Sequence, residues 1–148
     1  MAKAGEADQR RGFFHAALGP YVVGCVGSDL KNAAQTLLAL QRSDGGWSGN
    51  PYMKTDAYAT SVALVALAES KVIKVNDPPY RRGIDYLLST QFPDGSWHVR
   101  SRAIKFQPYF ESGFPFGHDQ WISAAATAWA AQALALSIGP LAVTAIAR

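Results

Sequence analysis

The sequence predicts an all-α fold made of helical hairpin repeats, and three observations support that class. Within the 148 residues, Leu-Leu-x-x-Gln followed by Asp-Gly-x-Trp occurs twice, with the second copy 50 residues after the first. Apolar residues ahead of each copy follow the i, i+3, i+4, i+7 spacing of one helix face. The alternation typical of a strand is confined to Ser96–Arg102. Each unit of such a repeat buries its apolar face on a neighbour, so the repeat decides the architecture.

The first predicted helix covers Leu30–Gln41, with Ala34, Leu37, Leu38 and Gln41 on one stripe. It ends at an Asp-Gly pair, which is a turn signal because glycine tolerates backbone conformations that other residues avoid. The residues of this loop that recur later are Gln41, Asp44, Gly45 and Trp47.

The second predicted helix covers Asp56–Ser70. Its inward face consists of small and branched apolar residues, and these small residues allow close helix approach: Ala59, Val62, Ala63, Ala66 and Leu67. Asp56 is positioned to cap this helix, because an N-cap carboxylate accepts hydrogen bonds from the first free backbone N–H groups.

The second repeat begins with a predicted helix at Pro79–Gln91, which ends in the matching loop residues Gln91, Asp94, Gly95 and Trp97. Its second helix is found by matching Ala126–Leu134 to Ala59–Leu67, at an offset of 67 residues. The offset grows from 50 to 67, so about 17 extra residues lie within His98–Trp121. That stretch is rich in aromatic residues, glycine and proline, and we expect a structured loop there.

The repeated loop indicates a scaffold device. Gln41 and Gln91 fall on the apolar stripe at the last helical turn, and a buried amide needs hydrogen-bond partners such as free backbone groups at a nearby helix end. Trp47 and Trp97 can shield that amide with an apolar ring. The sequence therefore predicts that these loops hold helices together and that neither indole points into solvent.

Composition and charge limit the partners, disulfides and membrane segments that we expect. The net charge of +3 comes from scattered basic residues, so nucleic acid is not expected as a partner. Cys25, the one cysteine, rules out an internal disulfide framework. Arg10 to Cys25 resembles a lipoprotein signal, yet a preceding helix or loop explains it better. The uncharged stretch from Gln120 to Ala147 is long enough to span a bilayer, but its alanine content favours a buried helix.

We divide the chain into an N-terminal segment at 1–29, the two repeats at 30–138 and a tail at 139–148. Two hairpins bury too little by themselves, because repeat proteins usually need about three units or more. The expected partners are the remainder of a larger array or a second copy of this chain. For the compartment, cytoplasmic or membrane-associated is favoured over secreted, and peripheral membrane contact stays open.

Gln-x-x-Asp-Gly-x-Trp after a leucine pair resembles the QW repeat of squalene–hopene and oxidosqualene cyclases, within the terpenoid cyclase and protein prenyltransferase superfamily. Arg81–Trp97 carries the pattern most fully, and Gln107–Pro115 and Ser123–Ala135 are similar to the C-terminal part of bacterial squalene–hopene cyclases. The resemblance spans roughly Leu30–Ser137. It implies a partial α/α toroid, a relation to isomerases that cyclise linear triterpenes, and an apolar isoprenoid-like ligand.

The acid that starts cyclisation in that family lies in a D-x-D-D-T-A motif, because an unactivated alkene needs a strong acid in a dry pocket. This chain has no D-x-D-D. When Thr60 is aligned with the motif threonine, Asp56 takes the first position and Tyr58 the proton-donating one. Tyrosine is far too weak an acid for this step. The resemblance therefore predicts no catalysis by this chain alone. If Thr60 belongs to a different repeat from the motif threonine, the acid motif lies outside this chain.

Three residues are candidates for direct chemistry: Asp56, His118 and Asp119. Asp56 and Asp119 can also be read as helix caps, and His118 as a loop residue that could join Asp119 and Glu111 in a cluster. A zinc site like that of protein prenyltransferases would need Asp, Cys and His together. Cys25 lies outside the matched region, so we expect no metal and no cofactor.

A cluster of aromatic residues surrounds the inserted segment and has two open interpretations. The rings could line an apolar cavity for a polyprenyl or triterpene chain, or they could pack the inserted loop onto the helices. The set comprises Phe106, Tyr109, Phe110, Phe114, Phe116, Trp121 and Trp129.

Two functions from different classes follow. The first is a squalene or terpenoid cyclase-like segment that is not catalytically competent by itself. The second is a non-catalytic helical module that binds an apolar ligand or a protein partner. A polysaccharide-acting or protein-prenylating relative has less support from the motifs.

Overall fold

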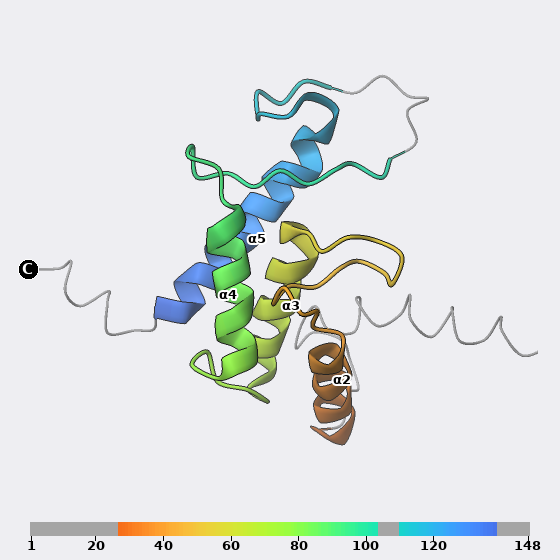
Figure 1. Ribbon diagram of the computed structural model, residues 1–148, viewed down its shortest axis with the longest axis vertical. Coiled ribbons are helices and arrows are strands. Elements are labelled where there is room, and N and C mark those ends of the chain that lie inside the picture. The colour runs from red at the N-terminus through yellow and green to blue at the C-terminus, as the bar shows by residue number, and fades with distance from the viewer. Residues whose placement is uncertain (1–26, 104–109, 139–148) are drawn as a thin grey trace, which may run out of the picture.

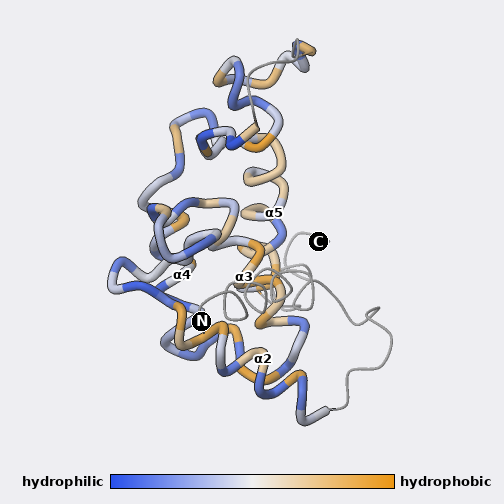
Figure 2. Tube along the Cα trace, turned by 90° about the vertical axis from the view of Figure 1, so that its right-hand side faces the viewer, coloured by the Kyte–Doolittle hydropathy of each residue, from blue (hydrophilic) through white to orange (hydrophobic). Residues whose placement is uncertain are grey.

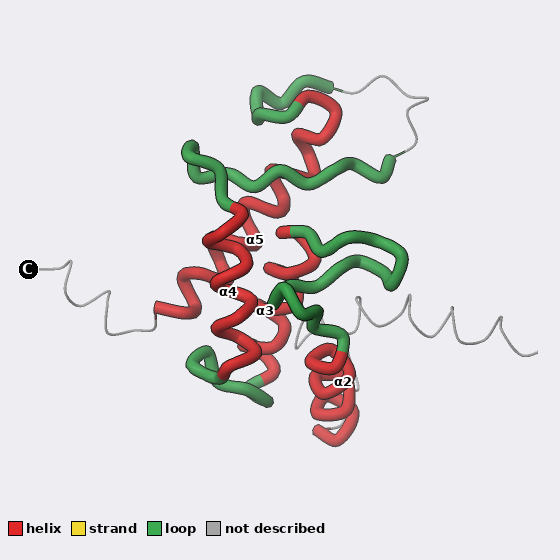
Figure 3. The backbone as a smooth tube through the Cα atoms, in the orientation of Figure 1, coloured by secondary structure: helices red, strands yellow, loops and turns green. Residues whose placement is uncertain are grey.

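A computed structural model describes residues 27–103 and 110–138, and this part of the chain is all-α, as predicted (Figures 1 and 3). The elements in chain order are α2 (Gly27–Ala39), α3 (Ala57–Ser70), α4 (Pro78–Thr90), the 3-10 turn η1 (Gly117–Asp119) and α5 (Gln120–Ile138). The extra residues of the second repeat lie between α4 and α5, and the described part of this connection is loop except for η1. Cys25, Phe106, Tyr109 and the 139–148 tail lie outside the described residues.

The first three predicted helices agree with α2, α3 and α4 to within three residues at each end. The fourth is longer than the matched stretch, because α5 begins six residues before Ala126 and continues to Ile138. Closure of these helices into a toroid stays a prediction.

Helix α3 is the centre of the core. It packs against α5, α4 and α2, and ten of its residues, Ala57 and the nine from Ala59 to Leu67, are buried. The carboxylate of Asp56 caps it by accepting the Ala59 N–H at 2.8 Å, as the sequence predicts. Lys71 ends it in the left-handed conformation with φ of 56°. Figure 2 shows hydrophobic colours along the visible part of α3.

Helix α4 lies against both α3 and α5. Gly83 permits this approach, because a Cβ at this position would lie 2.7 Å from a methyl carbon of Leu64 and 3.1 Å from the Trp47 ring. Tyr80 is fully buried, and its hydroxyl donates to the Ala133 carbonyl at 2.9 Å. A single tyrosine thus connects the two helices of the second repeat.

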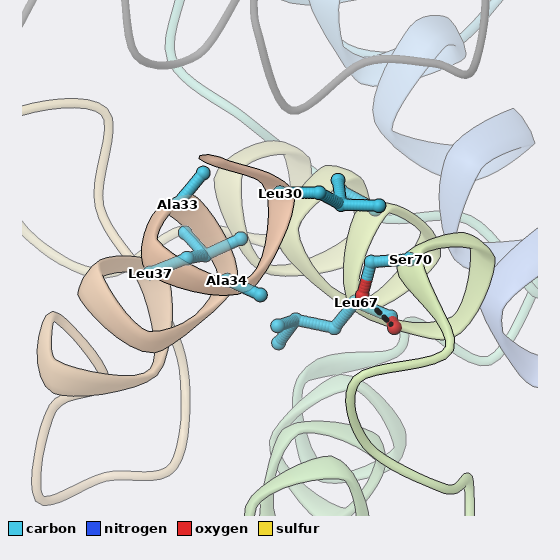
Figure 4. A pocket seen from close by; sticks show the side chains of 7 residues that line it. Leu30, Ala33, Ala34, Leu37, Leu67 and Ser70 are labelled. Atoms are coloured by element: carbon cyan, nitrogen blue, oxygen red, sulfur yellow. Dashed lines mark hydrogen bonds between the residues drawn. The ribbon is translucent and has the colours of Figure 1, made fainter. Parts of the chain in front are cut away.

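Helix α2 meets α3 less completely, and a small cavity of about 20 Å³ lies between them (Figure 4). It is lined by α2 residues that include Leu30 and Ala33, and by Ala66, Leu67 and Ser70 of α3. Leu30 occupies the position that Tyr80 takes in the second repeat, 50 residues later. The shorter side chain explains the space, which is about the volume that one water molecule needs.

One described segment, Gly117–Ile138, is long and apolar enough to cross a membrane by length and composition. Core helices of soluble proteins meet the same criterion, and α5 packs along α3.

Candidate functional site

The two repeated loops adopt the same hydrogen-bonded turn. In the first, the Arg42 N–H donates to the Gly46 carbonyl at 2.9 Å, and in the second Phe92 N–H donates to Ser96 at 2.9 Å. Gly45 and Gly95 have φ of 88° and 85°, a region that favours glycine. The carboxylates of the two loop aspartates, 44 and 94, each accept the N–H two residues ahead, at 3.1 and 2.9 Å.

Both indole rings of these loops are buried, with 1% of Trp47 and 2% of Trp97 exposed. Each indole N–H donates to the carbonyl ten residues earlier, at 2.7 Å to Leu37 and 2.8 Å to Leu87. The sequence expectation that neither ring points into solvent therefore holds in the structure.

Each loop is also tied to the helix that follows it. The backbone N–H of Trp47 donates to the Thr60 hydroxyl at 3.0 Å, and that of Trp97 donates to the Thr127 hydroxyl at 3.1 Å. Thr60 and Thr127 are the pair aligned at an offset of 67 residues, so the alignment of the second helices is correct in space.

The glutamines were expected to be buried in the last helical turn, and that expectation is wrong for Gln91. Gln91 is exposed, and Gln41 is only half-buried; both follow the last helical residue. Gln41 contacts α4 through Pro79 and Arg82, as expected for a helix-end contact. No described helix lies over Gln91, whose amide donates to Gly95 in its own loop at 3.0 Å.

A cleft of about 560 Å³ lies where the second loop passes the N-terminal end of α3. It is formed by the start of α3 and the residues before it, by the C-terminal half of α4, and by the strand-like segment after Trp97. Its lining is Met53, Lys54, Thr55, Asp56, Ala57, Tyr86, Thr90, Phe92, Trp97, His98, Val99, Arg100 and Arg102. One of the three proposed catalytic residues, Asp56, is part of it.

Asp56 uses both carboxylate oxygens as acceptors. One accepts the Ala59 N–H and caps α3, and the other forms an ion pair with the guanidinium of Arg102. A general acid has to donate a proton, so this arrangement suits a structural carboxylate more than an acid.

Asp119 pairs with His98, at 2.8 Å between the ring Nε2 and one carboxylate oxygen. Its other oxygen accepts the Ser101 N–H at 2.7 Å, which fixes the segment after Trp97 against η1. The expected cluster was different, since it joined Asp119 to His118 and Glu111. Glu111 is exposed and its carboxylate accepts the N–H of Gly113 at 3.3 Å, while His118 is exposed in η1. Among residues 27–103 and 110–138, no three His, Cys, Asp or Glu side chains are grouped as a metal site would require.

The cleft combines an apolar wall with basic groups. Tyr86, Phe92 and Trp97 supply ring surface, and Lys54, Arg100 and Arg102 supply positive charge. Burial, followed by the negative charges of Asp44 and Asp56, raises the pKa of Tyr86 to about 12, so its hydroxyl keeps its proton at neutral pH.

The described aromatic residues of the predicted cluster lie in three different places in the structure. Phe116 contacts two residues of the cleft lining, with ring centroids 5.4 Å from Phe92 and 4.9 Å from His98, and the Phe114 ring lies 6.3 Å from that of Phe116. Phe110 and Trp121 are 80% and 58% exposed, and the Trp121 indole N–H donates to the Phe110 carbonyl at 2.9 Å. Trp129 is half-buried on α5 against the core.

Sequence reasoning missed His98, Arg102 and Gln120. The alternating polar residues of Ser96–Arg102 were a signal for the first two, since every second side chain of an extended segment faces the same way. Gln120 is fully buried, and its carbonyl oxygen accepts from Ser112. Its Nε2 has no hydrogen-bond partner within the described part of the chain.

No family model matches the chain, whereas two curated proteins are similar to about half of it. Drimenyl diphosphate synthase of Streptantibioticus cattleyicolor is 28% identical over 81 residues, which cover 55% of this chain and 15% of that protein. Squalene–hopene cyclase of Bradyrhizobium diazoefficiens is 31% identical over 97 residues, which cover 58% of this chain and 13% of that protein. The chain thus spans under one sixth of the length of these relatives, and its similarity to terpenoid cyclases is distant and partial.

Proposed function

We propose that this chain is a two-repeat segment of a terpenoid cyclase-like helical array, which binds an isoprenoid ligand in the cleft between its repeats. The observation that carries the proposal is the paired loop geometry: Gln, Asp, Gly and Trp at a spacing of 50 residues, with both indoles bonded to helix carbonyls and both loops bonded to a threonine. The partial similarity to two terpenoid-forming enzymes supports the same reading.

The cleft suits a ligand with an apolar body and an anionic end. Ring and aliphatic surface from Tyr86, Phe92 and Val99 can contact a hydrocarbon chain. Lys54 and Arg100 add positive charge that Asp56 does not neutralise, because Asp56 is paired with Arg102. One similar protein is named for a terpenoid diphosphate, which has this combination of parts. We therefore place prenyl diphosphates ahead of neutral isoprenoids as ligands.

The proposed segment does not start a cyclisation by itself. The first position of the aligned acid motif, Asp56, is committed to Ala59 and Arg102. The proton-donating position is Tyr58, which is half-buried at the start of α3 and is too weak an acid to protonate an alkene.

Binding is tested by titrating the chain with a C15 prenyl diphosphate, the corresponding alcohol and squalene, while following tryptophan fluorescence. We expect saturable quenching, strongest for the diphosphate, because Trp97 lies in the cleft lining. Each mixture is then extracted and examined by gas chromatography and mass spectrometry, and no cyclised product is expected.

Two matched pairs of variants locate the ligand. Phe92→Ala removes a ring from the cleft and should weaken binding about fivefold, the effect of roughly 1 kcal/mol of lost apolar contact. Phe110→Ala removes an 80% exposed ring that does not line the cleft and should leave binding unchanged. Arg100→Gln should weaken the diphosphate selectively, whereas Arg81→Gln, on the exposed side of α4, should not.

Equal losses for both members of a pair would show that the ligand lies elsewhere. The absence of saturable binding by any of the three compounds would remove the binding proposal. A cyclised product that disappears in Asp56→Asn would instead make the chain a catalyst.

The second candidate function is a module that binds another protein chain. One observation favours it: α5 is apolar on all sides, yet only five of its residues are buried, so much of its apolar surface is open. A surface of this kind is typical of an interface.

A further inference from the structure

In the first repeat, the loop and the second helix contact α4. In the second repeat, the corresponding loop and helix are partly exposed. We infer that the Gln91–Trp97 loop and the open face of α5 bind the start of α2 from a second copy of this chain, so that copies associate head to tail. This inference goes beyond the proposed function and does not depend on the ligand.

The template for this contact is the junction between the first loop and α4. The Gln41 amide donates to the Pro79 carbonyl at 2.7 Å, and its oxygen accepts from the Arg82 guanidinium at 2.6 Å. The backbone of Arg82 approaches so closely that a Cβ on Gly45 would lie 2.5 Å from the Arg82 carbonyl oxygen. The first loop is therefore filled by the start of the helix that begins the next repeat.

The second loop has the same shape but is open within the described part of the chain. The Gln91 amide donates to Gly95, as the Gln41 amide does to Gly45, but Gln91 is exposed and has no bond to a described helix like that of Gln41 to Pro79. A Cβ on Gly95 would meet only the Gln91 amide nitrogen, at 3.9 Å. The glutamine and the glycine that contact α4 in the first loop thus have counterparts in the second loop, and no described helix contacts them there.

Helix α5 independently indicates the same missing neighbour. It is the counterpart of α3, and both are apolar helices with small residues at matching positions. Ten of the 14 residues of α3 are buried, but only five of the 19 in α5 are. Helix α3 packs against α2, α4 and α5, whereas α5 packs against α3 and α4 among the described helices. The open loop and the open helix face belong to the same repeat, so a single neighbour would cover both.

The start of α2 has the features of that neighbour. It corresponds to the start of α4 at an offset of 50, which matches Asp29 with Pro79 and Asn32 with Arg82. Residues 27–32 are all exposed, so their backbone and side chains are accessible to another chain. Asn32 has an amide that can donate to the Gln91 oxygen, as Arg82 donates to Gln41.

Side-chain size at the contact also agrees. At the first junction Gly83 of α4 faces Leu64 of α3, and the glycine is needed because a Cβ there would lie 2.7 Å from the leucine. At the second junction the corresponding residues are Ala33 of α2 and Ala131 of α5. Both residues at the second junction are small, so the two helices can approach closely there as well.

The contact is heterologous, because the loop of one copy meets a different surface, the start of α2, on the other. This geometry gives a specific test by mixing two variants. Gly95→Asn places a side chain in the loop contact, and asparagine tolerates positive φ better than most residues do. Asn32→Glu places a charge on the exposed α2 contact, outside the cavity between α2 and α3, and leaves the loop intact.

Sedimentation velocity over a concentration series, without ligand, measures the association. We expect the wild-type chain to form dimers and longer species, and each variant alone to associate at least about tenfold more weakly, since each places a side chain or a charge in a packed contact. A mixture of the two should form a one-to-one heterodimer, because one variant keeps its α2 start and the other keeps its loop.

Two substitutions serve as controls and should sediment like the wild type. Gly113→Asn makes the same change at another positive-φ glycine, with φ of 79° and no neighbour within 4 Å of its Cβ. Gln35→Arg adds a charge to α2 at a position whose counterpart in α4, Asp85, is exposed. If Gly95→Asn lowers the unfolding midpoint, Ala131→Arg, at an exposed position on α5, blocks the same junction.

A wild-type chain that stays monomeric at its highest soluble concentration overturns the inference. So does a mixture of folded variants that forms no heterodimer, or a monomer whose α5 face binds phosphatidylcholine vesicles instead of a second copy. Ligand binding is unaffected by these results, so the two proposals can fail separately.

Discussion

Substituting alanine for each loop glycine in turn should reveal how much the contact between repeats contributes to stability. Gly45 and Gly95 occupy the same place in the two loops, with φ of 88° and 85°. They differ in surroundings, because a Cβ on Gly45 would clash with the Arg82 backbone, whereas a Cβ on Gly95 would be in ordinary contact with the Gln91 amide nitrogen at 3.9 Å. Gly45→Ala therefore perturbs both the turn and the junction, and Gly95→Ala perturbs the turn alone.

The expected magnitudes follow from that difference. Placing an L-residue in the left-handed region costs about 1–2 kcal/mol, and both variants lose this amount. At Gly45 the new Cβ would also lie 2.5 Å from a backbone oxygen, which cannot move without shifting α4. Overpacking of this kind costs about 1–3 kcal/mol. We expect losses of about 2–5 kcal/mol for Gly45→Ala and about 1–2 kcal/mol for Gly95→Ala.

Urea unfolding followed by circular dichroism measures both values, at a protein concentration low enough for the chain to be monomeric. An unchanged m-value with a lower midpoint assigns the loss to stability. For a chain of this size each kcal/mol lowers the melting temperature by about 2–4 °C, so the two variants should differ by several degrees. Equal losses would refute the reasoning, because they would mean that the Arg82 backbone does not constrain the first loop.

Three further predictions concern the helix contacts. Thr60→Val removes the acceptor for the buried Trp47 N–H and should cost about 1–3 kcal/mol in urea unfolding, with a smaller loss for the half-buried Thr127→Val. Asp56→Ala should cost about 0.5–2 kcal/mol while Asp56→Asn, which keeps the cap, costs less; equal losses would make the Arg102 ion pair the dominant contact. Burial raises the pKa of Tyr80 to about 12, so the unfolded chain loses this proton first and stability should fall as the pH rises from about 10 to 12. Tyr80→Phe should reduce that slope in unfolding measured across the same range, and an unchanged slope would assign it to other groups such as Tyr86.

Local features of the fold could be predicted from the sequence because they depend on residues close together in the chain. The 3.6-residue periodicity located α2, α3 and α4, and the Asp-Gly pairs located the turns. The match between Ala59–Leu67 and Ala126–Leu134 also placed Thr60 and Thr127 correctly, since both accept a tryptophan N–H. Repetition supplied this long-range information, because two copies of one unit need the same contacts.

The cleft could not be predicted in the same way. Its ion pair joins Asp56 to Arg102, 46 residues apart, and its histidine pair joins His98 to Asp119 across the inserted segment. The identities of these residues are not repeated between the two units, so nothing in the pattern brings them together. The burial of Gln91 was misjudged for a related reason: exposure depends on whether a neighbour covers the loop, and the loop sequence alone does not specify one.

The charged and aromatic residues of the cleft occur at the junction between the two repeats and would be absent from a junction between two copies of the chain. The cleft is built where the second loop and α4 meet the start of α3, so its lining comes from both repeats. At a junction with a second copy, the residue in the place of Asp56 would be Ser123, and the residue in the place of Tyr86 would be Thr36. Ser123 is fully buried and bonded to Val99, and it carries no charge. Association of copies would therefore repeat the scaffold without repeating the cleft, because the loops hold helices together and the residues between them determine what each junction can bind.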